Sequence, residues 1–160
     1  MTRAWISAGT NVDPERNLRA AVHQLQREFG ELLLSPVYRT EAVGFAGDDF
    51  LNMVVGIDTD LPPAQLRAWL RNIEDQQGRV RGDEKFASRT LDLDLLTWGD
   101  LVDMDAGIPR DEILRYAFVL KPLVDVAGKE KYPGTEHSHE QLWQQFQGQK
   151  AGMSLLDWDW

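Results

Sequence analysis

Two acidic residues, Asp92 and Asp94, stand one residue apart within residues 89–96, where the sequence reads Arg-Thr-Leu-Asp-Leu-Asp-Leu-Leu. Successive side chains of a β-strand point to opposite faces, so both carboxylates would share one face and the leucines between them the other. Carboxylate oxygens at this spacing can hold divalent cations. Like charges side by side on a half-buried strand are costly unless a cation or several donors compensate them. An exposed acidic strand face is the alternative, and the pair alone does not decide.

The loop before this strand, residues 78–89, concentrates positive charge in an otherwise acidic chain. Its four cations are Arg79, Arg81, Lys85 and Arg89. Arginine binds phosphate oxygens through a planar fork, and a loop can close such groups over a ligand. Cations beside a metal-binding carboxylate pair are what phosphoryl transfer requires. A solvated loop whose arginines simply pair with the two acids explains the same charges, so both interpretations stay open.

Other kinds of site are excluded or disfavoured by the sequence. The chain has no cysteine, which excludes disulfides, thiolate catalysis and cysteine-based zinc sites. It contains no G-x-x-x-x-G-K-[ST] motif, and residues 9–11 are too short for a P-loop or a Rossmann fingerprint. His137 and His139 have no third metal ligand nearby in the sequence, and we interpret them as surface residues. Nothing in the sequence indicates a nucleophile elbow.

The composition is that of a globular protein. At 160 residues the chain is long enough for a core without disulfides or metals, and its hydrophobic fraction of 42% and charged fraction of 27% are ordinary. A net charge of −9 opposes non-specific binding to nucleic acid. The sequence enters a strand-like segment at once and has no apolar run of about 18 residues, so we expect neither a signal peptide nor a membrane span. We expect a soluble, cytoplasmic protein.

The elements that must position the acidic pair are predicted in the order strand, helix, two strands, helix, strand. The predicted strands cover residues 4–8, 32–40 with a break at Pro36, 50–59 and 89–98. The predicted helices cover about residues 14–29, 60–77 and 138–146, with a short helical segment after Pro109 and an apolar run over 117–126. This order predicts an α+β fold, a ferredoxin-like two-layer α/β sandwich with an antiparallel sheet, in a single domain over residues 1–160.

The acidic stretch and its surroundings resemble one known family. Residues 76–81 together with 89–96 resemble the signature region of the 6-hydroxymethyl-7,8-dihydropterin pyrophosphokinases, which belong to the folate pathway. Further segments match in the same order, at residues 6–11, 37–40, 50–52, 108–109 and 118–123. The resemblance covers most of the chain, and the Asp-x-Asp with its upstream arginine is its most specific part.

The resemblance implies a ferredoxin-like fold and a transferase activity. The pyrophosphoryl group of ATP, the co-substrate, would move to the hydroxymethyl oxygen of a reduced pterin, with release of AMP. Asp92 and Asp94 would hold two Mg²⁺ ions that bridge the ATP phosphates. Arg79 and Arg89 would contact phosphate, and Arg81 would lie on a loop that closes over the nucleotide.

The resemblance also assigns two sets of ligand contacts. Contacts to ATP would come from Glu74, Arg81, Phe86, Arg89, Leu95, Arg110 and Arg115. Contacts to the reduced pterin would come from Thr40, Glu41, Val43, Phe50, Asn52 and Phe118. Asn52 would hydrogen-bond the polar edge of the pterin, and Phe50 and Phe118 would sandwich its ring. Neither a nucleic acid nor a membrane is implied as a partner, and we expect a monomer.

Departures from the family pattern concentrate on the nucleotide side. Arg110 and Asp111 stand where the family usually has a histidine and an aromatic residue, and Tyr116 stands where it has an arginine that reaches the phosphates. Further departures are Asp105, Gly107, Phe86 and Ser88. We expect Arg110 or Arg115 to replace the missing cation. Two alternatives stay open, a diverged paralogue acting on a related pterin and a pterin- or nucleotide-binding module without turnover.

Overall fold

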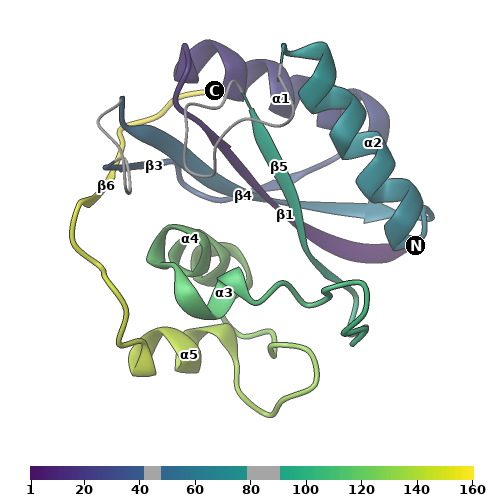
Figure 1. Cartoon of the computed structure of the whole chain (residues 1–160), viewed down its shortest axis with the longest axis vertical. Helices are drawn as coiled ribbons and strands as arrows, with labels where there is room; N and C mark the ends of the chain where they lie inside the picture. The colour runs from purple at the N-terminus through teal and green to yellow at the C-terminus, as the bar shows by residue number, and fades with distance from the viewer. Residues whose placement is uncertain (42–47, 79–90) are drawn as a thin grey trace.

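The computed structural model describes residues 1–41, 48–78 and 91–160, and these residues form a sheet with helices on both of its faces (Figure 1). The strands are β1 (Thr2–Thr10), β2 (Leu33–Leu34), β3 (Tyr38–Thr40), β4 (Phe50–Thr59), β5 (Asp92–Trp98) and β6 (Met153–Leu155). The helices are α1 (Pro14–Phe29), α2 (Pro63–Gln76), α3 (Glu112–Arg115), α4 (Ala117–Ala127) and α5 (His139–Gln145). Among the described helices, none is long and apolar enough to span a membrane.

The sheet has the strand order β5-β1-β4-β3-β6, with β2 also paired to β4. Every strand pair in it is antiparallel. Strand β1 therefore lies between β4 and β5, the two strands that precede and follow α2 in the chain. This topology confirms the predicted ferredoxin-like α+β fold.

Helices α1 and α2 cover one face of the sheet and enclose the larger core. The apolar residues of α1 recur every three or four positions, which puts Leu18, Ala21, Val22 and Leu25 on the stripe that faces the sheet. Asp13 occupies the cap position of this helix, but its side chain makes no capping hydrogen bond. The predicted two-layer packing rests on this interface.

Helices α3, α4 and α5 lie on the opposite face, as an addition to the two-layer core (Figure 1). There Trp5 of β1, Val54 of β4 and Leu96 of β5 form one buried cluster with Leu120 and Leu123 of α4. The hydroxyl of Tyr38 on β3 donates a hydrogen bond to the Asp125 carboxylate, which ties the sheet to α4. This face carries the site described below.

Three details differ from the sequence-based predictions or refine them. The strand predicted over residues 32–40 consists of the separate strands β2 and β3, because proline lacks the amide hydrogen needed at Pro36. Strand β6 was not predicted. His139 is 1% exposed, so its interpretation as a surface residue is wrong. Its Nδ1 lies 2.9 Å from the carbonyl oxygen of Ala127, in the contact between α4 and α5.

Candidate active site

A row of residues crosses the sheet and joins the acidic strand to the predicted pterin side. Gly9 of β1 lies opposite Asn52 of β4 on one side and opposite Asp92 of β5 on the other. Residues directly opposite each other in a sheet share a face. Trp5 packs in the cluster that includes α4, and Gly9, four residues later on the same strand, points to the same face, so all three residues of the row face α4. Neighbouring strands are about 4.8 Å apart, so roughly 10 Å separates the backbones of Asn52 and Asp92.

The residue between these two side chains has no side chain of its own. A Cβ atom placed on Gly9 would lie 2.7 Å from Oδ1 of Asn52, closer than real Cβ contacts allow. Asn52 is 5% exposed, and its Nδ2 donates a 2.6 Å hydrogen bond to the hydroxyl of Thr40. The glycine therefore keeps the space that the buried amide occupies, and any larger residue would displace that amide.

Asp94 lies one strand repeat beyond Asp92, opposite Ser7, with its side chain 30% exposed. Burial and the neighbouring charge of Asp92 raise the pKa of the Asp94 carboxyl from 3.8 to about 7, an effect that Arg110 opposes and that Glu112 and Glu74 reinforce. The cause is an excess of negative charge in a place with little water. A divalent cation would relieve this excess.

The acid pair has the donor set expected for magnesium. Mg²⁺ is bound in kinase-type sites by one or two carboxylates, with the remaining ligands supplied by phosphate and water. Among the residues that the structure describes, no group of three or more acidic, histidine or cysteine side chains forms a complete metal cage. Asp92 and Asp94 therefore fit a metal that arrives with a phosphate-bearing ligand, and not a preformed all-protein site.

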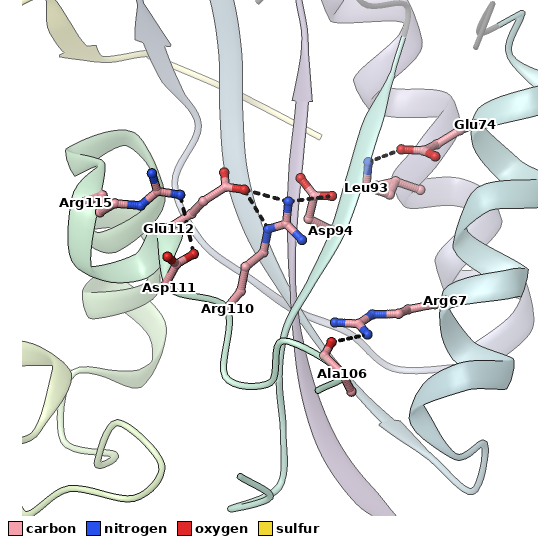
Figure 2. Close-up of polar contacts among 9 residues, drawn as sticks. All are labelled: Arg67, Glu74, Leu93, Asp94, Ala106, Arg110, Asp111, Glu112 and Arg115. Carbon is pink, nitrogen blue, oxygen red and sulfur yellow. Dashed lines mark hydrogen bonds and ion pairs between the residues drawn. The ribbon is translucent and has the colours of Figure 1, made fainter. Parts of the chain in front are cut away.

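Arg110 lies beside the acid pair and between two carboxylates (Figure 2). Its Nη2 is 3.7 Å from Oδ1 of Asp94, and its Nε donates a 2.8 Å hydrogen bond to Oε1 of Glu112. Its backbone amide donates to the carbonyl oxygen of Leu96 at 2.8 Å, which attaches this segment to β5. A guanidinium is thus held next to the carboxylates where phosphate oxygens would bind.

Glu74 supports the acidic strand from the helix side. It is 5% exposed, and its Oε2 accepts a 2.8 Å hydrogen bond from the backbone amide of Leu93, between the two aspartates (Figure 2). A buried carboxylate needs such donors, and in return it fixes the position of β5. This contact holds the acid pair in register with α2.

On the predicted pterin side, a cavity of about 380 Å³ opens next to the row. Its lining includes Thr40, Glu41, Tyr116, Phe118 and Met153. The rings of Tyr116 and Phe118 are stacked, with centroids 5.0 Å apart and planes 23° apart. A hollow of this size with aromatic walls and an amide nearby suits a flat heteroaromatic ring.

Comparison with known proteins identifies the family. Residues 5–128 match the sequence model of the family described as 7,8-dihydro-6-hydroxymethylpterin-pyrophosphokinase. The chain belongs to this family. It is thus a transferase, a pterin diphosphokinase that moves the pyrophosphoryl group of ATP to 6-hydroxymethyl-7,8-dihydropterin in folate synthesis.

Relatives in the pterin pyrophosphokinase family match over most of their length. A 2-amino-4-hydroxy-6-hydroxymethyldihydropteridine pyrophosphokinase from Pseudomonas aeruginosa is 36% identical over 146 residues, covering 88% of this chain and 90% of that protein. The Bacillus subtilis protein of the same name is 31% identical over 156 residues, covering 94% and 93%. Family and enzyme class, as predicted from the sequence, are confirmed.

Solved structures agree at the level of the fold. A Plasmodium falciparum HPPK-DHPS structure with pterin and p-hydroxybenzoate has a TM-score of 0.75 and 12% identity to this chain. The match covers 96% of this chain and 46% of that one. At this identity the likeness supports the fold alone.

The structure separates the two cations that were candidates for the nucleotide side. Arg110 adjoins Asp94, whereas Arg115 pairs with Asp111 at 3.4 Å and lies over the ring of Tyr116, 5.2 Å from its centroid. In Figure 2 Glu112 lies between Arg115 and Asp94. Arg115 lines the cavity of the pterin side instead.

Several predicted contacts stay untested. Val43, Arg79, Arg81, Phe86 and Arg89 lie outside the described residues. Leu95 is 1% exposed and packs in the core under α1 and α2, so its side chain does not reach the face of the acid pair. Phe50 lies opposite Thr40 in the β3–β4 pairing, which places it on the pterin side.

Three features of the site were not found from the sequence. Glu112 was not assigned a function, although its position two residues after a candidate cation was a usable signal. Tyr116 was noted only as a missing arginine, and its stacking depends on the backbone turn between α3 and α4. Gly152, whose carbonyl oxygen accepts a 3.0 Å hydrogen bond from the amide of Glu41, belongs to a segment without a strong pattern.

Proposed function

We propose that this chain catalyses the family's reaction on the α4-side face of the sheet, along the row Asn52–Gly9–Asp92. The observation that carries the proposal is this row, because it puts an amide suited to read a pterin and a carboxylate suited to hold a metal on one face, about 10 Å apart. That span matches a bicyclic ring with a hydroxymethyl group directed at the acid pair. Binding both substrates there supplies the proximity on which the rate enhancement depends.

The acid pair would anchor the nucleotide. Asp92 and Asp94 would hold two Mg²⁺ ions, which would act as Lewis acids and offset the negative charge that shifts during transfer. The chain's own contribution is to fix the two carboxylates through β5, whose Leu93 amide is held by Glu74. We infer that Glu74 does not contact the nucleotide itself and supports its binding by fixing β5 at Leu93, between the two aspartates.

Arg110 would supply the cation on the nucleotide side. Its Nη2 is 3.7 Å from Oδ1 of Asp94, so it would reach a phosphate bound beside that carboxylate, whereas Arg115 lines the cavity with Thr40 and Phe118. A guanidinium can bind two phosphate oxygens at once and stays charged at every physiological pH. The loop residues Arg79, Arg81 and Arg89, with Phe86, would complete the nucleotide contacts, as the resemblance implies.

The pterin would lie between aromatic side chains and read a fixed amide. Asn52, oriented by Thr40, would bind the polar edge of the ring, and Phe50 and Phe118 would contact its faces. Glu41 and Val43 would complete this pocket. We also propose that residues 1–160 act as one domain, as a monomer in the cytoplasm, where ATP and reduced pterins are available.

One observation favours a second candidate, a diverged enzyme for a related pterin. Tyr116 covers one face of Phe118 with its own ring, so the ligand would meet a two-ring wall. A substituted pterin that stacks on this wall would then be the better substrate. Comparing several reduced pterins in the assay below separates the two candidates.

The test is magnesium-dependent release of AMP. We expect AMP only when 6-hydroxymethyl-7,8-dihydropterin, ATP and Mg²⁺ are all present, and we expect Asp92→Ala to lower turnover at least 1000-fold because the phosphates lose their metal ligand. Anion-exchange chromatography of the nucleotides measures both. Asp58→Ala is the matched control, since Asp58 is a carboxylate at the far end of β4, paired with Arg3 at 2.8 Å.

Two outcomes would contradict the proposal. Absence of AMP with every reduced pterin at saturation would leave a binding module without turnover. Turnover in Asp92→Ala close to that of the parent protein would show that the acid pair does not take part in the reaction.

A further inference from the structure

The pair Arg110–Glu112 has a feature that the proposed function does not use. The guanidinium of Arg110 contacts two carboxylates, and only one of them, Asp94, belongs to the acid pair. The other, Glu112, receives both Nε and Nη2 of the arginine and is 25% exposed. Both nitrogens of this fork contact a single oxygen, Oε1, and two charge-assisted contacts to one acceptor hold that edge of the guanidinium toward Glu112.

The backbone on both sides of this pair is held in place. The amide of Arg110 is bonded to Leu96 of β5 at 2.8 Å. Glu112 begins α3, and the next residue, Ile113, is fully buried in the core between the sheet and α4. Because the backbone is fixed, the long side chain of Arg110 is the movable part, and Glu112 is what limits its rotamers.

We propose that Glu112 is a positioning residue for Arg110. Before a metal ion binds, it holds the Arg110 guanidinium beside Asp94, where the guanidinium acts as a counter-cation. When a metal ion binds the acid pair, Glu112 keeps the guanidinium at the site, where it can bind phosphate. This inference rests on the proposed function of the same site. Before the nucleotide arrives, Arg110 offsets part of the negative charge of Asp92 and Asp94. Once a divalent cation binds Asp94, that carboxylate no longer attracts the arginine, and the fork to Glu112 keeps the guanidinium at the site.

Loss of Glu112 should therefore act in two ways on the same arginine. Without the fork, Arg110 has more rotamers, and ordering them on binding costs free energy. Its remaining attraction is to the acid pair, so it also competes with the metal for Asp94. Both effects weaken binding of a magnesium–nucleotide complex, and both require Arg110 to be present.

The test is a double-mutant cycle read by binding. Isothermal titration calorimetry with Mg²⁺ and an ATP analogue that cannot be cleaved measures affinity for the parent protein, Glu112→Gln, Arg110→Met and the double variant. We expect Glu112→Gln to weaken binding about 5- to 20-fold, Arg110→Met about 10- to 100-fold, and the double variant no more than Arg110→Met alone. Thermal unfolding confirms that each variant is folded.

The matched control is Asp111→Asn. Asp111 is the neighbouring carboxylate, 74% exposed, and its partner Arg115 does not face the acid pair. We expect its affinity to stay within twofold of the parent. An equal loss in Asp111→Asn would overturn the proposal, because general loss of negative charge would then explain the effect.

Three further results are decisive. Unchanged affinity in Glu112→Gln, or losses that add in the double variant, would overturn the positioning of Arg110 by Glu112. A parent protein that binds the analogue but releases no AMP would contradict the proposed function, while the cycle would still measure the positioning. A parent protein that binds no magnesium–nucleotide complex would overturn both.

Discussion

At the scale of single residues, Gly9 matters because a side chain at its position would collide with Asn52. It lies between Asn52 of β4 and Asp92 of β5, and Oδ1 of Asn52 occupies the space that a Cβ atom would take. In the sequence, this position was only one of the residues 6–11 that match the family. Its physical reason is a close approach in the central strand, which becomes visible once the register of β1 with β4 is known.

Gly9→Ala should weaken binding of the pterin without weakening binding of the nucleotide. The added methyl group would push Asn52 from Thr40, so we expect pterin affinity to fall at least tenfold and unfolding free energy to fall by about 1–3 kcal/mol. Titration with the reduced pterin and chemical denaturation measure these effects. Affinity for the magnesium–nucleotide complex serves as the internal control and should change less than twofold. Unchanged pterin affinity would contradict the assignment of Asn52.

At the scale of elements, the sequence predicted the helices and strands whose residues follow local rules of spacing or capping. The apolar spacing of α1, the alternation of β5 and the Ser138 cap of α5 each follow from local rules, and each is present. Strand β6 depends instead on pairing with β3, and its three residues have no pattern of their own. The shift in register between Trp5 and Ile6 and the pairing of Arg110 with Glu112 likewise need three-dimensional contacts.

The contact between α4 and α5 should give the fold a pH dependence. Burial lowers the pKa of His139 below its ordinary value of 6.5, and among the described residues its Nε2 has no hydrogen-bond partner. Below pH 6.5 the unfolded chain therefore takes up a proton that the folded chain resists, so stability falls as the pH falls. We expect the parent protein to lose about 1 kcal/mol more than His139→Asn between pH 7 and pH 5.

Urea denaturation at the two pH values measures this difference. His137→Asn, which changes an exposed histidine two residues away, is the control and should keep the pH dependence of the parent protein. Identical pH dependence in the parent protein and His139→Asn would show that another group titrates.

At the scale of the whole molecule, the C-terminal segment returns to the first helix and to the pterin side. Arg19 of α1 donates a 2.7 Å hydrogen bond to the carbonyl oxygen of Asp159, and its guanidinium lies 4.4 Å from the ring of Trp158. Upstream of that contact, β6 pairs with β3, and Gly152 and Met153 line the cavity. One arginine on α1 thus helps to hold the segment that forms one wall of this cavity.

Arg19→Ala should loosen this wall without unfolding the protein. We expect hydrogen exchange at the β6 amides to accelerate at least tenfold and pterin affinity to fall a few-fold, because the ligand must then order the segment as it binds. Mass spectrometry of exchanged peptides and pterin titration measure the two effects. Arg16→Ala is the control, since Arg16 is 84% exposed on the same helix. Equal exchange rates in both variants would exclude a function of Arg19 in holding the segment.

The central position of β1 also constrains how the protein is made. Strand β1 is made before both of its neighbours in the sheet, β4, which ends at Thr59, and β5, which ends at Trp98. At about 5–20 residues per second, β1 therefore waits roughly 4–18 s for β5 after its own last residue is made. During that time the edge of β1 that will pair with β5 stays open, and an open strand edge can pair with another chain.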